Sequence, residues 1–152
     1  MTDLLNFWNQ HTPIFSILLP AFTAFVLVLL GNPGSGSLVT DWRQPWRRGI
    51  SYVSSILGLI IAVSYLVDSN QGQINVYTLG EWVAPFGIVL VLDQLSAMML
   101  VLTYALAVPV LWYASKEWDM RGRYFHAMVH FLLMGLTGAF LTGDLFNLFV
   151  FF

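Results

Sequence analysis

The side chains that could move protons are few, and two of them form a pair late in the sequence. His126 and His130 are four residues apart, so they share one face of a helix. Imidazole titrates near neutral pH, and the pair could therefore act as a proton relay near the end of an apolar helix. The alternative is one histidine at a membrane interface and one packed against a neighbouring helix. Two histidines with no nearby Cys, Asp or Glu on that face are too few ligands for a metal, so we expect no metal site.

A second polar pair stands just after the last long apolar stretch. Asp144 and Asn147 are three residues apart at the start of a further apolar run. They could line the outer approach to an ion path and help to dehydrate a cation. The sequence favours a simpler interpretation, in which Asp144 caps a helix and Asn147 bonds to another helix.

The composition shows what kind of protein must position these groups. The chain is 58% hydrophobic and 9% charged, with a mean hydropathy of +0.75, whereas soluble domains average about 25% charged residues. A net charge of −2 with six Lys and Arg residues leaves no basic patch for nucleic acid. The absence of cysteine excludes disulfides and thiol catalysis. We find no nucleophile–base set or phosphate-binding loop, so we expect a membrane protein that is not an enzyme and has no cofactor.

Four stretches without Asp, Glu, Lys or Arg are each about as long as a helix that crosses a bilayer. They cover residues 14–30, 50–67, 95–114 and 125–142. The apolar run at 145–152 is the start of a fifth span and would extend only about 12 Å. The sequence therefore predicts an all-α polytopic membrane protein with four complete spans and a truncated fifth. We expect residues 1–152 to be one fragment of a longer protein.

The basic residues predict the topology. They fall in two connections, between the first and second spans and between the third and fourth. They are Arg43, Arg47, Arg48, Lys116, Arg121 and Arg123. By the positive-inside rule, the loops 31–49 and 115–124 are cytoplasmic, whereas the N-terminus and residues 68–92 are outside.

The outer segment differs from the spans, because residues 73–79 are rich in β-formers with partial alternation. A β-hairpin within 73–91 that caps the outer face and an irregular loop with Trp82 and Phe86 at the interface are both consistent with the sequence. Asp93 follows, where an N-cap for the third span is expected.

Two further patterns predict contacts rather than chemistry. Ser54, Gly58 and Ala62 form a stripe of small residues on which another helix could pack closely. Residues 42–48 combine tryptophans and arginines, which predicts an anchor with the arginines facing anionic lipid. A contact with another subunit is the alternative for these residues.

Three motifs carry a resemblance to a known family. They are YTLGEW at residues 77–82, LDQLSAMM at 92–99 and TGDLFNLFVFF at 142–152. The sequence resembles the D subunit of the Mrp-type (Pha) multisubunit monovalent cation/proton antiporters. These proteins are related to the antiporter-like subunits of respiratory complex I.

The resemblance implies a fold and a function. The full protein would have many helices in inverted repeats, and this chain would be its N-terminal fragment, inactive alone. The residue after Phe152 would be the glutamate through which ions are translocated, so no catalytic or ion-coupling carboxylate is expected within this chain. The complex would exchange cytoplasmic Na+ or K+ for external H+ in the bacterial inner membrane, with other antiporter subunits and the lipid bilayer as partners.

Two alternatives remain open at this point. The chain could come from an antiporter-like, proton-pumping subunit of a complex I-type NADH or ferredoxin oxidoreductase. It could also be a short membrane anchor or assembly protein.

Overall fold

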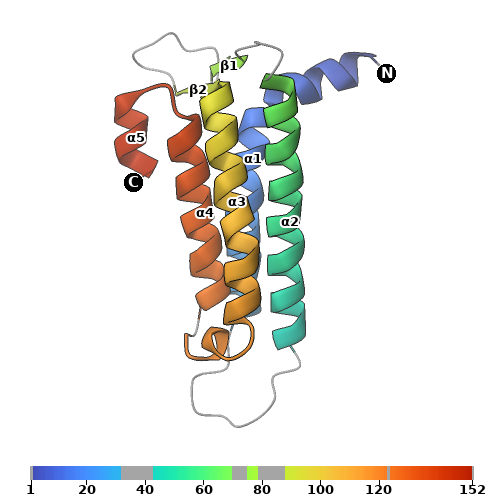
Figure 1. The fold of residues 1–152 in the computed structure, drawn as a ribbon, viewed down its shortest axis with the longest axis vertical. Coiled ribbons are helices and arrows are strands. Elements are labelled where there is room, and N and C mark those ends of the chain that lie inside the picture. The colour runs from blue at the N-terminus through green and yellow to red at the C-terminus, as the bar shows by residue number, and fades with distance from the viewer. Residues whose placement is uncertain (1, 32–42, 70–74, 79–87, 123, 152) are drawn as a thin grey trace.

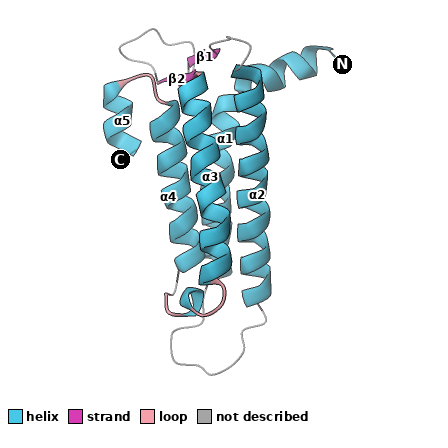
Figure 2. Cartoon of the chain, in the orientation of Figure 1, coloured by secondary structure: helices cyan, strands magenta, loops and turns pink. Residues whose placement is uncertain are grey.

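Four long helices run side by side and form an elongated bundle (Figure 1). The computed structural model describes residues 2–31, 43–69, 75–78, 88–122 and 124–151. The long helices are α1 (Thr2–Leu30), α2 (Gln44–Ser69), α3 (Gln94–Ala114) and α4 (Phe125–Leu141). A 3-10 helix, η2 (Trp118–Met120), lies between α3 and α4, and α5 (Leu145–Phe151) follows α4. Figure 2 shows that the strands among the described residues lie at one end of the bundle.

The lengths of these helices agree with the predicted spans, with two differences. Three described helices are long and apolar enough to cross a membrane: the His11–Leu30 part of α1, then α2 and α3. The predicted fourth span is the apolar helix α4, which has 17 residues and extends about 26 Å. The other difference is at the starts of α1 and α2, which precede the charge-free stretches. Charge-free length marks only the hydrocarbon-facing part of a helix. At the start of α2 the helix continues through arginines, which are good helix formers.

The helices are arranged so that α2 and α4 face each other across the interior. Helix α1 contacts α2 and α4 as neighbours, and α3 contacts the same two helices. Because successive helices alternate in direction, α2 and α4 run the same way (Figure 1). The apolar core lies towards the end that carries the strands and includes Leu90, Leu92, Leu100, Tyr104 and Leu133.

A two-stranded antiparallel sheet covers that end of the bundle. Strand β1 (Asn75–Thr78) pairs with β2 (Val89–Leu92), with Asn75 opposite Leu92. The predicted hairpin is therefore present, whereas Trp82 and Phe86 lie outside the described residues. Alternate β2 side chains are buried on the helix ends, which explains why a run of four apolar residues forms the second strand.

The predicted helix cap and the predicted packing stripe are both confirmed. The backbone N–H of Ser96 donates to Asp93 Oδ1 at 2.7 Å, and this hydrogen bond lowers the pKa of Asp93. On α2, Ser54, Gly58 and Ala62 are all buried. A Cβ on Gly58 would overlap the Tyr104 ring of α3, so only glycine permits this approach.

The start of α2, which carries Arg47 and Arg48, and helix η2 lie at the same end of the bundle, opposite the strands (Figure 1). The prediction that the arginines face lipid is wrong for Arg47, which is 9% exposed. Its Nη1 donates to the Gly31 carbonyl at 2.6 Å, where the C-terminus of α1 favours a positive charge. Trp46 is 66% exposed, as an interfacial anchor requires.

Candidate functional site

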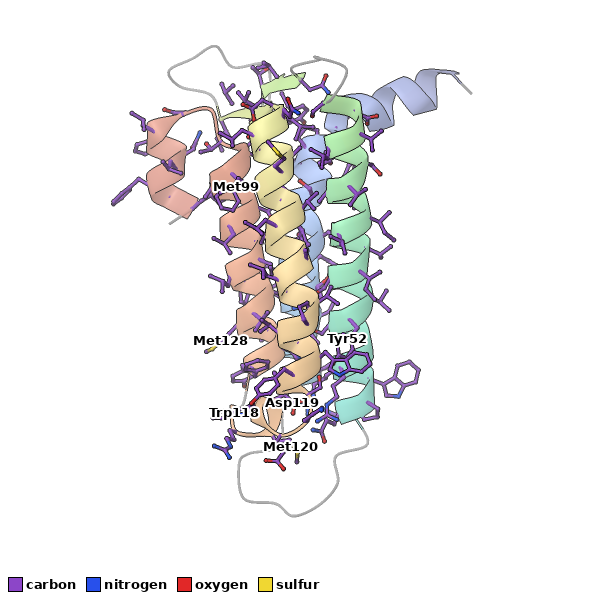
Figure 3. The ribbon with its side chains drawn as sticks, in the orientation of Figure 1. Tyr52, Met99, Trp118, Asp119, Met120 and Met128 are labelled. Atoms are coloured by element: carbon purple, nitrogen blue, oxygen red, sulfur yellow. The ribbon has the colours of Figure 1, made fainter. Side chains whose placement is uncertain are left out.

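A buried ion pair closes the end of the bundle that carries the basic connections. Helix η2 turns Asp119 inwards, under the bundle, whereas Trp118 and Met120 on either side are exposed (Figure 3). Arg48 of α2 binds Asp119 with two hydrogen bonds, Nε to Oδ2 at 2.6 Å and Nη2 to Oδ1 at 2.9 Å. The Asp119 side chain is 2% exposed and that of Arg48 is 29% exposed. This bidentate geometry fixes η2 against the start of α2.

His126 extends this ion pair into the bundle. Its Nε2 lies 3.2 Å from Asp119 Oδ2, and its Nδ1 lies 3.1 Å from Ser51 Oγ. An ionised carboxylate only accepts hydrogen bonds, so Nε2 carries the proton and Nδ1 of the neutral ring accepts from the Ser51 hydroxyl. Three elements, α2, η2 and α4, thus meet at one imidazole.

Asp119 is held in its charged form. Burial raises the pKa of this carboxyl, but the hydrogen bonds from Arg48 and His126 outweigh burial, and the net pKa lies below the usual value. A group whose pKa is lowered by folding stabilises the protein above its unfolded pKa of about 3.9. That contribution is lost as the pH falls through the folded pKa.

We therefore expect a specific loss of stability in acid. Asp119→Asn removes the ionisable group. The difference in unfolding midpoint between wild type and variant should therefore be constant above about pH 5 and should disappear as the pH is lowered further. The measurement is thermal unfolding of the purified full-length protein, followed by tryptophan fluorescence at a series of pH values. A gap that stays constant down to pH values well below about 3.9 would show that Asp119 is not stabilised as a carboxylate.

His130 lies one turn further along α4 and is 0% exposed. Its Nδ1–H donates to the His126 carbonyl at 2.9 Å, which leaves Nε2 as the free base of a neutral ring. Among the described residues, His130 Nε2 and Ser55 Oγ are the buried side-chain atoms without a hydrogen-bond partner. The predicted pair of histidines thus shares one face, and that face points into the bundle.

Asp144 and Asn147 lie at the opposite end, so the structure does not bring them together with the histidines (Figure 1). The backbone N–H of Phe146 donates to Asp144 Oδ1 at 3.2 Å, which is an N-cap contact at the start of α5. Asn147 is buried at 7% exposure. Helix α5 rests on α4, where a Cβ on Gly138 would overlap the Phe151 ring.

A small pocket lies beside the ion pair. It has a volume of about 20 Å³ and is bounded by side chains that include Arg47, Asp119, Tyr124 and His126. This volume is enough for one water molecule. No three His, Cys, Asp or Glu residues in the described part of the chain lie close enough to hold a metal ion.

Sequence reasoning did not identify Arg48, Ser51, Ser55 or Asp119 as site residues. A signal exists on α2, because positions 48, 51 and 55 follow helical spacing on one face. Asp119 carries a weaker signal, an acid between Trp118 and Met120 in a short connection, and only the fold shows that it turns inwards.

No protein-family model matches the chain. Among curated proteins, it is 41% identical over its whole length to the D subunit of a probable K(+)/H(+) antiporter of Rhizobium meliloti. It is 38% identical to the D subunit of an Na(+)/H(+) antiporter of Alkalihalophilus pseudofirmus over 90% of the chain. The chain spans 27% of the length of each of these relatives.

Solved structures show the same relationship. The chain superposes on the Mrp complex from Dietzia with a TM-score of 0.79 and 28% identity, and the match covers 93% of this chain and 24% of that one. An archaeal membrane-bound sulfane sulfur reductase matches with a TM-score of 0.72 at 25% identity, over 91% of this chain and 27% of that one. The N subunit of an NADH-quinone oxidoreductase of Desulforudis audaxviator is 29% identical over 94% of the chain and 28% of its own length. These similarities confirm the resemblance to the D subunits of Mrp antiporters and their relation to respiratory complexes.

Proposed function

We propose that this chain is part of the D subunit of a multisubunit Na+(K+)/H+ antiporter, which exchanges cytoplasmic Na+ or K+ for external protons. The observation that carries the proposal is the 41% identity to such a protein over the whole of this chain. The superposition on the Mrp complex supports it. Such a protein is a secondary transporter driven by the proton gradient, and its partners are the other antiporter subunits and the lipid bilayer.

Within this function, we propose that His126 and His130 carry protons at the end of the bundle near η2. The geometry that supports this is the continuous contact from Asp119 to His126 and from the His126 carbonyl to His130. Imidazole can gain and lose a proton near neutral pH, as a relay requires. From the resemblance, we expect the ion-translocating carboxylate directly after Phe152 on the helix that α5 begins.

The experiment is transport in inverted membrane vesicles from cells without their own antiporters. The full-length protein is expressed with its partner subunits, and respiration acidifies the vesicle interior. Addition of Na+ or K+ should dissipate the pH gradient, which a pH-sensitive dye reports. Vesicles with the partner subunits but without this protein are the control, and equal dissipation in both would reject the proposal.

We propose the orientation in which the loops 31–49 and 115–124 are cytoplasmic and the N-terminus is outside. Its support is that the arginine-bearing start of α2 and helix η2 share one end of the bundle (Figure 1). Because residues 1–152 contain no cysteine, Gly72→Cys introduces a single labelling site into this part of the protein, between α2 and β1. We expect an impermeant maleimide to label it in intact cells from the outside. Labelling only in inverted vesicles would reverse the orientation.

For Asp144 we expect a capping role rather than ion binding. Asparagine is as good an N-cap as aspartate, so Asp144→Asn should leave the apparent affinity for the cation unchanged in the vesicle assay. A clear rise in the cation concentration needed for half-maximal exchange would instead make Asp144 part of the ion entrance, with Asn147 as its neighbour.

A second function is a proton-pumping subunit of a complex I-type oxidoreductase. The similarity to part of an NADH-quinone oxidoreductase and to an archaeal respiratory complex favours it specifically. The two functions differ in their energy source and partners. Co-purification with iron–sulfur or quinone-binding subunits would support the second, whereas co-purification with small antiporter subunits would support the first.

A further inference from the structure

A group of buried polar side chains lies in the bundle interior towards η2, next to the apolar core around Leu100 and Leu133. Here α1, α2 and α4 turn hydroxyl and imidazole groups inwards. These groups belong to Thr23, Ser51, Ser54, Ser55, His126 and His130. A buried polar interior in a membrane protein needs partners for each group, because lipid and apolar side chains supply none.

Most of these polar groups are paired in the described structure. The Thr23 hydroxyl donates to Ser54 Oγ at 2.8 Å, and Ser51 bonds to His126. Two groups are not paired, namely Ser55 Oγ and His130 Nε2, although both residues are 0% exposed. A buried group without a partner costs about 1–3 kcal/mol, so two such groups inside one bundle indicate a missing partner.

The helix geometry places these two atoms at the same level. Helices α2 and α4 run in the same direction across the bundle (Figure 1), and the Ser51–His126 contact sets their register. Ser55 and His130 are each four residues further on, which is about 6 Å along either helix. They therefore lie at the same level, one turn above the Ser51–His126 contact, and no hydrogen bond joins the two atoms.

We propose that a water molecule bound between Ser55 Oγ and His130 Nε2 completes a proton path from His130 to the aqueous phase at the η2 end. The chemistry of the two atoms supports this. His130 Nε2 is an acceptor, and a hydroxyl both donates and accepts, so a water molecule can satisfy both groups. The pocket of about 20 Å³ beside Asp119 and His126 provides a second water position, at the mouth of the path.

Each transfer along this path conserves protons. The Ser51 backbone is a hydrogen-bond neighbour of the His130 ring, so water at His130 Nε2 is also beside Ser51. A protonated His130 gives its Nε2 proton to the bound water, and the water passes a proton to Ser51 Oγ. Ser51 releases its own hydroxyl proton to His126 Nδ1, and His126 releases its Nε2 proton to water in the pocket. A change of rotamer or tautomer then resets the chain. The reverse sequence carries a proton inwards.

Asp119 is a positioning residue in this path. Its carboxylate accepts from His126 Nε2–H and so leaves Nδ1 facing Ser51 as an acceptor. The charged groups that act on His126 are Asp119 of η2 and Arg47 and Arg48 of α2, and His126 itself is the titratable neighbour of His130.

X-ray radiolytic footprinting of the purified full-length complex tests the water site. Hydroxyl radicals form at bound water and oxidise the side chains beside it, so His130 should be oxidised although it is fully buried. Leu133 is the dry reference, being 3% exposed on the same helix, and exposed Trp118 is the positive reference. Ser55→Val fills the water position, and we expect it to abolish oxidation of His130 while Trp118 is unaffected. Ser55→Ala adds no bulk and should weaken the signal if the valine variant does not fold.

The proton-carrying part of this inference rests on the proposed function, but the water site is tested independently of it. Oxidation of His130 no greater than that of Leu133, or unchanged in both Ser55 variants, overturns the water site whatever the transport assay shows. If wild-type vesicles show no cation-dependent proton movement, the proposed antiport fails, and the footprint still decides whether the water site exists.

If antiport is present, His130→Gln should slow proton exchange. The control is Ser64→Ala, which should leave the rate unchanged because Ser64 is exposed and bonds to the Ile60 carbonyl. A wild-type rate in His130→Gln overturns the path.

Discussion

Asp119→Asn should lower the free energy of unfolding of the full-length protein by about 2–3 kcal/mol, because a hydrogen bond to a charged group contributes that much. The variant keeps the shape of the side chain but removes the charge that binds Arg48 at 2.6 and 2.9 Å. Arg48 is then left with a positive charge that is 29% exposed and has lost its carboxylate. The measurement is the unfolding midpoint of the purified protein in detergent at pH 7.

The matched control is Glu117→Gln, two residues away in the same connection. Glu117 is exposed, so its neutralisation should change stability by less than about 0.5 kcal/mol. Equal effects of the two variants would show that the loss comes from net charge at this end of the bundle and not from the buried pair.

Gly58→Leu should destabilise the bundle by about 3 kcal/mol or prevent assembly, because an overpacked core cannot absorb a side chain at this position. Even a Cβ at Gly58 would overlap the ring of Tyr104. That ring is 2% exposed, and its hydroxyl lies 3.4 Å from Thr137 Oγ1. Helices α2 and α3 would have to separate to admit the leucine. The yield of folded complex and its unfolding midpoint measure the effect.

Gly49→Leu provides the control on the same helix, since a Cβ there meets nothing within 4 Å. We expect this variant to assemble as wild type. The pairing with Tyr104 is tested by Gly58→Leu combined with Tyr104→Ala, in which the leucine occupies space that the ring has left. The combined loss should be smaller than the sum of the two single losses. Strictly additive losses would show that Gly58 and Tyr104 do not share this contact.

The membrane architecture was accessible from the sequence because a bilayer imposes strong rules on length and charge. Spans follow from charge-free stretches, and the shared end of the two basic connections follows from the positions of the arginines. The Asp93 cap and the close approach at Gly58 follow from local chemistry that needs no knowledge of the fold. The hairpin was one of two open alternatives, because alternation over so few residues does not determine a partner strand.

The buried polar site was not accessible in the same way. Asp119 is in a connection that charge alone assigns to water, and its burial depends on η2 folding back to Arg48. The spacing of His126 and His130 predicted a shared face but not its direction, since the interior and the lipid are both apolar on average. Ser51 and Ser55 were not singled out from the sequence, because a serine in an apolar helix often bonds within its own helix. Only the contact with His126 gives the Ser51 hydroxyl another role.

The most direct test of antiport is proton flux in proteoliposomes that contain the purified full-length complex and no redox enzyme. An acid-inside gradient is imposed by dilution, and external Na+ or K+ is then added. We predict that the interior becomes more alkaline only when the cation and the complete complex are both present, and that quinone and NADH have no effect. A complex that moves no protons in response to either cation, but moves them during electron transfer to quinone, would contradict the antiporter assignment.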